Sequence, residues 1–278
     1  MFLDRTKNIV ILGGDKRQIE LYNILKEHDL GVEHIQDGND LKKRKKLVSE
    51  AGTIILPIPV SKNGKTVFSL NTAEPIRLSD LKKQINDKAK IIGGNFSEKT
   101  KAVFKNYEIY DFCSDEALVL KNAYLTAQAA LQIIFENRDC FINSQKVLIS
   151  GFGRVSQLCA LLLSSLGANI YIAARSAEQR AKAQCLGYKT LEISDIEKTV
   201  FHFDIIISTV PFNVFSHDAI NKTRKNSLFI ELASAPYGSD EKFFNDETAK
   251  YIFAPSLPGR YYPETSARII YKTIKNLI

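Results

Sequence analysis

Glycines spaced for a phosphate-binding turn stand in the middle of the chain, at Gly151 and Gly153 of the segment GFGRVS. The segment follows an apolar, strand-like run and precedes a stretch with helical periodicity, which is the context that a dinucleotide fingerprint requires. A Cβ at either glycine would obstruct the turn or the approach of a pyrophosphate to the helix N-terminus. Ser156 is small enough for the third glycine position. We expect Gly151, Gly153, Arg154 and Val155 to bind a dinucleotide.

The end of the next predicted strand indicates which dinucleotide binds. An NAD-preferring site has Asp or Glu there, whereas this chain reads Ala173-Ala174-Arg175-Ser176. A guanidinium pairs with a 2′-phosphate, which a carboxylate would repel. We therefore expect Arg175, Ser176 and Arg180 to bind NADP(H), with NAD(H) as the less favoured cofactor. The alternative is that Arg175 is only a charge on a surface loop.

Three further loops follow predicted strands of the same half of the chain. The loop at Thr209, Val210 and Pro211 is expected beside the cofactor, because ligands of open α/β sheets bind at the carboxyl ends of the strands. Each loop has the alternative of a turn punctuated by Pro and Gly. The other two loops supply the candidate substrate residues Ser234, Pro258 and Gly259.

The first half of the chain shows a similar arrangement. Gly13-Gly14-Asp15 follows a predicted strand and offers backbone N–H groups at a helix start, with Arg17 as a nearby cation. This turn suits a carboxylate and lacks the spaced glycines of a nucleotide site. We therefore expect a substrate site that includes Asp15, Arg17, Gly94 and Asn95.

Histidine and cysteine suggest little chemistry. None of the four histidines stands in a loop that we assign to the cleft, so we expect structural or solvated roles, which argues against a histidine acid–base. The four cysteines are widely spaced and have no neighbouring His partner. We therefore expect reduced thiols and no metal site. The residues are His28, His34, His202 and His217, and Cys113, Cys140, Cys159 and Cys185.

Strands and helices alternate along most of the chain, which predicts parallel sheets. A long helix from about 114 to 136, without Gly or Pro, separates two α/β halves. We expect a substrate domain over residues 1–122 with a returning helix at 264–278, and a dinucleotide-binding domain over 123–263. The predicted strands are Asn8–Leu12, Thr53–Ile58, Ala89–Ile92, Tyr107–Phe112, Lys146–Ser150, Asn169–Ala174, Phe203–Thr209, Ser227–Leu232 and Lys250–Ala254.

Composition is that of an ordinary globular protein, with 278 residues of which 45% are hydrophobic and 25% charged. No apolar run reaches the roughly 18 residues of a membrane span, and acid and base near the N-terminus argue against a signal peptide. Residues 123–261 carry 14 basic and 13 acidic side chains, and the remainder carries 24 and 18. The run from Lys42 to Lys46 favours a solvated helix face over a nucleic-acid site, because no aromatic residues accompany it.

These motifs together resemble the dipicolinate synthase A-subunit family of spore-forming bacteria, over nearly the whole chain. The most specific segments are ILGGDKRQ, GFGRVSQ and LGANIYIAARS, supported by STVP, ELAS and APSLPG. The resemblance implies a flavodoxin-like domain and a Rossmann domain, as in D-2-hydroxy-acid dehydrogenases. It implies oxidation of a dihydrodipicolinate-type cyclic imine, a small dicarboxylate, with an NADP-type acceptor. It also implies a partner, the flavoprotein-like B subunit, in the cytoplasm of a sporulating mother cell.

The chain departs from the family pattern at four positions: Leu125, Gln128, Ala235 and Tyr237. Two alternatives therefore stay open. One is an NAD(P)-dependent dehydrogenase of another small 2-hydroxy or imino acid, and the other is a non-catalytic nucleotide-binding subunit. Whether the chain forms a homo-oligomer is also open.

Overall fold

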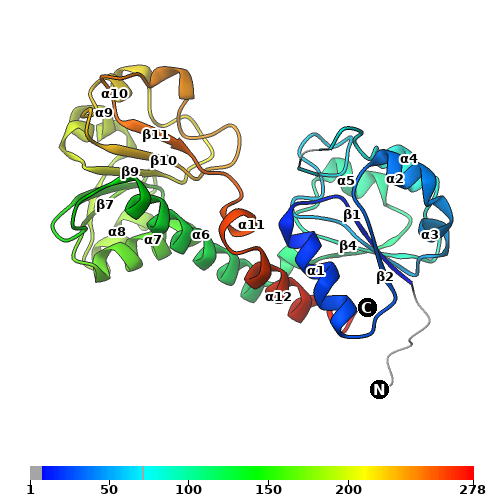
Figure 1. The fold of residues 1–278 in the computed structure, drawn as a ribbon. Coiled ribbons are helices and arrows are strands. Elements are labelled where there is room, and N and C mark those ends of the chain that lie inside the picture. Colours follow the sequence, from blue (N-terminus) through cyan, green and yellow to red (C-terminus); the bar gives the residue numbers. More distant parts are fainter. Residues whose placement is uncertain (1–7, 71) are drawn as a thin grey trace. The chain divides into compact units, whose positions relative to one another are not determined.

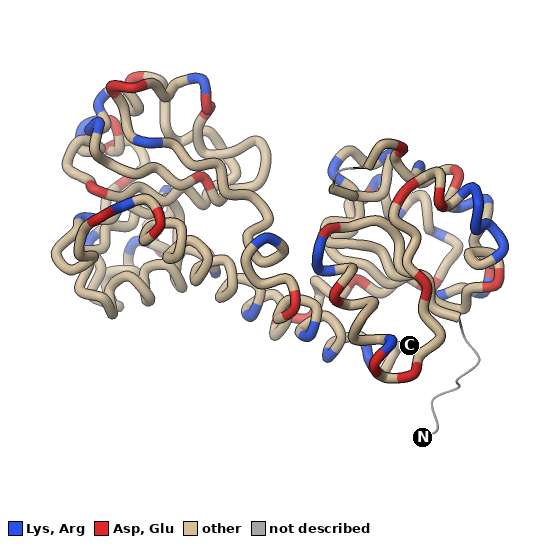
Figure 2. Tube along the Cα trace, in the orientation of Figure 1, with Lys and Arg blue, Asp and Glu red and all other residues tan. Residues whose placement is uncertain are grey.

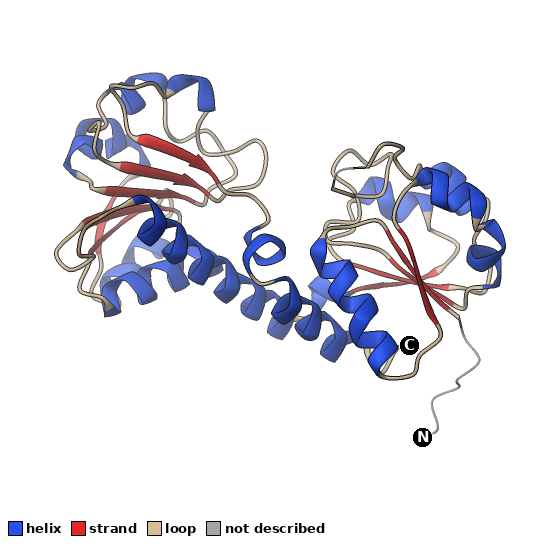
Figure 3. Cartoon of the chain, in the orientation of Figure 1, coloured by secondary structure: helices blue, strands red, loops and turns tan. Residues whose placement is uncertain are grey.

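The computed structural model describes residues 8–70 and 72–278. The charged N-terminal residues that argue against a signal peptide lie outside this described part. The chain divides into two compact units: unit 1 contains Met1–Asn122 and Gly259–Ile278, and unit 2 contains Ala123–Pro258. The boundaries fall within helices α6 (Glu116–Asn137) and α11 (Leu257–Tyr261). Each unit has parallel strands with helices on both faces (Figures 1 and 3), so the predicted α/β class is confirmed.

Unit 1 contains a five-stranded parallel sheet in the order β2-β1-β3-β4-β5. This is the flavodoxin-like order, in which the strand order reverses between β1 and β3. Loops that follow these two strands therefore face the same crevice at the carboxyl edge of the sheet. The strands are β1 (Ile9–Leu12), β2 (Val32–Ile35), β3 (Thr53–Ile55), β4 (Lys90–Gly93) and β5 (Glu108–Asp111).

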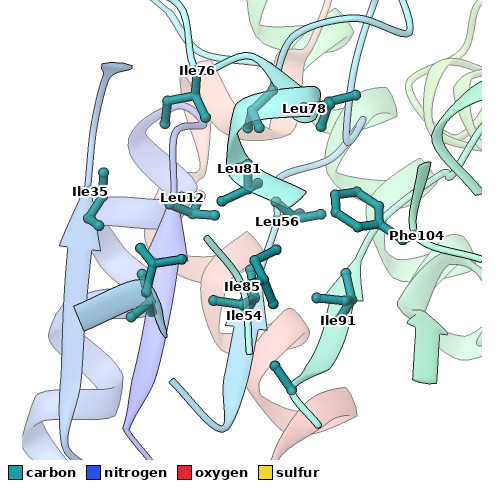
Figure 4. Close-up of a cluster of buried hydrophobic side chains, with 14 of the residues drawn as sticks. Leu12, Ile35, Ile54, Leu56, Ile76, Leu78, Leu81, Ile85, Ile91 and Phe104 are labelled. Carbon is teal, nitrogen blue, oxygen red and sulfur yellow. The ribbon is translucent and has the colours of Figure 1, made fainter. Parts of the chain in front are cut away.

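Helices cover both faces of this sheet. On one face α1 (Lys16–Glu27) and α12 (Pro263–Ile274) lie together, and Ile270 and Ile274 bury against Leu21 of α1. The other face holds a larger apolar cluster, drawn in Figure 4, in which Leu81 and Phe104 pack over strand residues such as Ile54. The helices that border this second cluster are α2 (Gly38–Lys43), α3 (Lys45–Glu50), α4 (Leu78–Lys82) and α5 (Glu98–Val103).

Unit 2 contains a six-stranded parallel sheet in the order β11-β10-β9-β6-β7-β8. Counted from the first strand of the unit, this is the doubly wound dinucleotide-binding order, and it reverses between β6 and β9. The strands are β6 (Lys146–Ser150), β7 (Asn169–Ala173), β8 (Lys189–Leu191), β9 (Ile205–Ser208), β10 (Leu228–Glu231) and β11 (Lys250–Phe253), and the helices include α7 (Arg154–Ser165), α8 (Ala177–Cys185), α9 (Ile196–Thr199) and α10 (His217–Asn221).

Most predicted boundaries differ from the observed ones by a residue or more, and two of the differences have a clear physical reason. The strand predicted over Thr53–Ile58 ends at Ile55, because Pro57 has no N–H to continue a ladder. The long helix begins at Glu116, where the Asp115 carboxylate accepts hydrogen bonds from the N–H groups of residues 117 and 118. The run of basic residues at 42–46 lies on α2 and α3, as predicted for a helix face.

Helix α6 is also notable for its composition. It is long and apolar enough to cross a membrane by those two criteria alone, in contrast to the sequence-based expectation. Of its most apolar window, 44% is buried inside the protein, and core helices and signal sequences pass the same two criteria. Length and hydropathy are therefore weak evidence for a membrane span here.

Candidate cofactor and substrate sites

The glycine turn after β6 leaves space at the start of α7. Gly151 has a φ of +79°, and a Cβ there would lie 2.8 Å from Cγ2 of Val210. Gly153 caps α7, and a Cβ there would meet no atom within 4 Å. The buried Ser156 hydroxyl donates to the Gly153 carbonyl at 2.9 Å and so satisfies its own hydrogen-bonding need. The open volume at Gly153 fits a pyrophosphate that approaches the N–H groups of a helix N-terminus.

The loop after β7 presents one cation and uses another to hold its shape. Arg180 Nη1 donates to the carbonyls of Ala174 and Arg175 at 2.8 and 2.9 Å, and its Nη2 pairs with Glu192 at 2.7 Å. Arg180 is therefore committed to the loop. The side chain of Arg175 is exposed and makes no hydrogen bond or ion pair to the described residues.

Ser176, the remaining predicted residue of this loop, caps α8. Its Oγ accepts from the N–H of Gln179 at 3.5 Å. Ser176 is next to Arg175. Because a hydroxyl carries both a donor and acceptor lone pairs, Ser176 Oγ can also donate to an anion bound beside Arg175.

The loop after β9 is tied to the glycine turn. Thr209 Oγ1 donates to the Ser150 carbonyl at 2.6 Å, and the Thr209 N–H donates to Ser150 Oγ at 3.1 Å. Val210 lies against Gly151, and Pro211 is exposed. The predicted cofactor residues of unit 2 therefore gather at the carboxyl ends of β6, β7 and β9, across the point where the strand order reverses.

A buried carboxylate that sequence reasoning missed organises the adjacent loop. Glu231, at the end of β10, is fully buried. Its Oε1 accepts from the N–H of Ala233 at 3.0 Å, and its Oε2 accepts from the N–H groups of Gly238 and Ser239 at 3.0 and 3.2 Å. Burial raises the pKa of Glu231, and the neighbouring Ser208 hydroxyl and these N–H groups lower it in part. The loop that carries the exposed Ser234 is thus shaped by one carboxylate.

In unit 1 the predicted residues Asp15 and Arg17 form a buried ion pair, so most of the guanidinium is already committed to the protein. Asp15 caps α1 in a capping box with Gln18, and both charged side chains are less than 5% exposed. Arg17 donates through Nε to Oδ1 at 2.9 Å and through Nη2 to Oδ2 at 2.7 Å. Its Nη2 also donates to the carbonyl of Ile58 at 2.8 Å, which joins the loops after β1 and β3. Among the described residues, Nη1 of Arg17 donates to no group.

The other candidates of unit 1 border this pair. A Cβ at Gly259 would lie 2.6 Å from Oδ2 of Asp15, so the backbone of α11 covers the pair directly. A Cβ at Gly94 would lie 2.8 Å from Cβ of Ile58, and the Gly94 carbonyl accepts from the N–H of Val60 at 3.0 Å. The loops after β1, β3 and β4 and residue 259 therefore meet, whereas Ser234 and Pro258 belong to unit 2.

Asn95 completes this edge and has a left-handed backbone with a φ of +58°. The carboxylate of Asp111, at the end of β5, accepts from the N–H groups of Asn95 and Phe96 at 2.9 and 3.0 Å. These bonds hold a conformation that non-glycine residues rarely adopt. Asp111, which the sequence did not indicate, fixes this loop as Glu231 fixes the loop in unit 2.

His34 was wrongly placed away from the candidate loops. It lines a hollow of about 260 Å³ with Gly13, Asp15 and Leu70, at the carboxyl ends of β1 and β2. Its Nε2 lies 3.0 Å from the Gly13 carbonyl, and burial lowers its pKa. A histidine near the end of a parallel strand was the signal that could have indicated this position.

No group of three or more His, Cys, Asp or Glu side chains able to hold a metal ion occurs within residues 8–70 and 72–278. The four cysteines, all in this part of the chain, form no disulfide.

Comparison with known proteins gives one consistent result. Residues 8–112 match the family of the N-terminal domain of the dipicolinate synthase A subunit. The A subunit of dipicolinate synthase from Bacillus subtilis (strain 168) is 23% identical over 97% of this chain and 95% of its own length. The crystal structure of the dipicolinate synthase A subunit from Bacillus halodurans has a TM-score of 0.84 at 23% identity and covers 98% of both chains.

A more distant structure has the same two-domain fold. The transhydrogenase from Sinorhizobium meliloti has a TM-score of 0.65 at 12% identity, over 97% of this chain and 93% of its own. Residues 8–112 thus match the family of the N-terminal domain of the dipicolinate synthase A subunit, and the chain as a whole is similar to that subunit.

Proposed function

We propose that this chain is an NADP-dependent oxidoreductase that converts a dihydrodipicolinate-type cyclic imine dicarboxylate to dipicolinate. The observation that carries the proposal is the open space at Gly153 together with the exposed guanidinium of Arg175 at the end of β7, which has no partner among the described residues. The likeness to the A subunit of dipicolinate synthase supports the reaction class.

Each cofactor-binding group has its own task. The N–H groups at the start of α7 bind the pyrophosphate, and the absence of a Cβ at Gly153 leaves room for it. Arg175 pairs with the 2′-phosphate, and Arg180 keeps Arg175 in place through two backbone carbonyls. Thr209 and Val210 border the turn from the β9 side. NADP, when bound, supplies a nicotinamide ring that accepts a hydride.

The substrate is a dianion and requires cationic or N–H groups. Asp15 and Ile58 hold the guanidinium of Arg17 in one orientation through Nη2. The N–H groups of Nη1 then donate to a carboxylate of the substrate. Oxidation of the dihydro ring removes one hydride and one proton and leaves the aromatic pyridine. Aromaticity supplies much of the driving force, so the proton can pass to water without a strong protein base.

The decisive experiment measures dipicolinate formation by ultraviolet absorbance from freshly generated dihydrodipicolinate, with NADP or NAD. Product with an NADP preference supports the proposal. Arg175→Ala should then weaken NADP binding by about 1–3 kcal/mol, typical of a charged hydrogen bond, with little effect on NAD. Equal loss for both cofactors would exclude the role of Arg175 at the 2′-phosphate.

Two other outcomes correspond to other functions. Turnover of a small 2-hydroxy or imino acid, without dipicolinate, would indicate a related dehydrogenase. NADP binding without turnover, even when a flavoprotein-like B subunit is supplied, would indicate a non-catalytic nucleotide-binding subunit. The departures at Gln128 and Ala235 are the positions to exchange first in either case.

A further inference from the structure

Two adjoining hollows lie on unit 1 away from the candidate substrate residues. One has a volume of about 450 Å³ and the other about 570 Å³, and both are lined by Arg77. We call them together the Arg77 groove. None of its lining residues is a candidate cofactor or substrate residue. Its charged lining residues are Lys42, Lys45, Lys65, Arg77, Lys82, Lys83, Glu74 and Asp80.

The groove concentrates the charge of the protein. Unit 1 carries 25 basic and 18 acidic side chains, whereas unit 2 carries 13 of each, so the whole net charge of +7 belongs to unit 1. Six cations and two carboxylates line the groove, a surplus of four positive charges. Figure 2 shows the basic run of α2 and α3 as a continuous blue stretch on this unit.

Backbone contacts fix the frame that carries these side chains. The N–H of Gly38 donates to the Glu74 carbonyl at 2.8 Å, which attaches the segment before α4 to the start of α2. The N–H of Leu78 donates to the Lys65 carbonyl at 2.9 Å, and Thr66 and Arg77 form an antiparallel bridge. The three segments that supply the cations are therefore held together without the cationic groups themselves.

Most of the cations are not neutralised by the protein. Lys42 pairs with Glu74 at 3.3 Å. Within the described part of the chain, the other five make no ion pair: Lys45, Lys65, Arg77, Lys82 and Lys83. Like charges brought close together repel one another, and an oxyanion bound between them removes that repulsion.

We propose that the Arg77 groove binds a small organic oxyanion that carries at least two negative groups. These groups lie between Arg77 and the neighbouring lysines. The combined volume is that of a metabolite-sized site. The inference does not rest on the proposed oxidoreductase function, since no residue is shared.

Calorimetric titration of the full chain tests the proposal with two probes, fructose 1,6-bisphosphate and citrate. Both carry several negative charges, and the comparison separates phosphate from carboxylate as the preferred anion. Saturable binding is expected at millimolar concentration. Arg77→Ala should weaken it by about tenfold. The fold should persist, because Arg77 makes no side-chain hydrogen bond as the cap of α4.

Matched variants distinguish a site from general electrostatic attraction. Lys46→Ala removes the same charge from a side chain outside the groove that is 85% exposed, and should change binding less than about twofold. Gly153→Ala should leave it unchanged, which separates the groove from the cofactor turn.

Three results would overturn the proposal. One is no saturable binding of either probe. Another is equal loss in Arg77→Ala and Lys46→Ala. The third is binding of a polyglutamate peptide without either probe, which would assign the groove to an acidic protein surface.

Discussion

The carboxylate of Asp15 and the guanidinium of Arg17 form a buried ion pair at the start of α1, with Nη2 of Arg17 2.7 Å from Oδ2 of Asp15. The two residues are close in the chain, but Nη2 of Arg17 also donates to the carbonyl of Ile58, which lies in the loop after the neighbouring strand β3. The charge on which substrate binding is proposed to depend is thus also part of the fold.

The first prediction concerns this pair. Arg17→Ala should lower the free energy of unfolding by about 3–5 kcal/mol, because it leaves the Asp15 carboxylate buried without its partner. The double variant Asp15→Asn, Arg17→Met should recover much of that loss. Urea unfolding measures both, and an unchanged midpoint in Arg17→Ala would show that the pair does not stabilise unit 1.

The second prediction separates two neighbouring glycines. Gly153→Ala should keep the wild-type melting temperature but weaken dinucleotide binding by about tenfold or more, because its Cβ enters open space at the helix N-terminus. Gly151→Ala should cost roughly 1–3 kcal/mol of stability, since its φ is +79° and Val210 is in contact. Thermal unfolding and cofactor titration of both variants test this, and the reverse order of effects would contradict it.

The third prediction contrasts two arginines of the β7 loop. Arg180→Ala should weaken NADP and NAD alike, because its guanidinium holds the backbone of residues 174 and 175. Arg175→Ala should affect NADP alone. Titration of both cofactors into both variants gives four affinities, and a selective NADP loss in Arg180→Ala would assign the 2′-phosphate to Arg180 instead.

The fourth prediction concerns the carboxylate under the β10 loop. Glu231→Gln retains the size of the side chain but replaces one acceptor oxygen with a donor, so it can no longer accept from Ala233 on one side and from Gly238 and Ser239 on the other. Hydrogen exchange should therefore become faster at the amide of Ala233 or at those of Gly238 and Ser239. The exposed Glu241→Gln serves as the control, and equal protection in both variants would show that Glu231 does not hold the loop.

The fifth prediction concerns pH. Burial lowers the pKa of His34 from its ordinary value of 6.5, so the folded state prefers the neutral ring. The stability from this preference is present above pH 6.5 and is lost as the pH falls through the folded-state pKa. Unfolding free energies at several pH values below 7 should fall more steeply for the wild type than for His34→Asn. Parallel curves would contradict it.

Much of the fold could be predicted from local patterns. Apolar runs such as Ile205–Ser208 lie in parallel strands because both faces of the sheet are covered, and the glycine turn after β6 has a recognisable spacing. The class of the fold and nine of the described strands follow from such signals, whereas the short strands β2 and β8 were not among the strands predicted by residue.

The site was less predictable because its contacts join segments far apart in the chain. The bond from Arg17 to Ile58 depends on how two strands neighbour each other, and Glu231 acts on a loop whose path no local pattern specifies. His34 stands at the end of β2, and the sequence alone does not show that this strand lies beside the glycine turn after β1. Arg180 was predicted as a ligand of the cofactor, but a side chain that bonds its own loop has the same sequence signal.

Unit 1 consists of two separate segments of the chain, which affects how it folds during synthesis. The face of its sheet that carries α1 is completed by Ala267, Ile270 and Ile274, which leave the ribosome after all of unit 2. Unit 2, a single continuous segment, can fold while unit 1 still exposes the apolar side of α1. During translation, therefore, the part of the chain made first is the part whose core closes last, and this interval is when unit 1 is most exposed to aggregation and proteolysis.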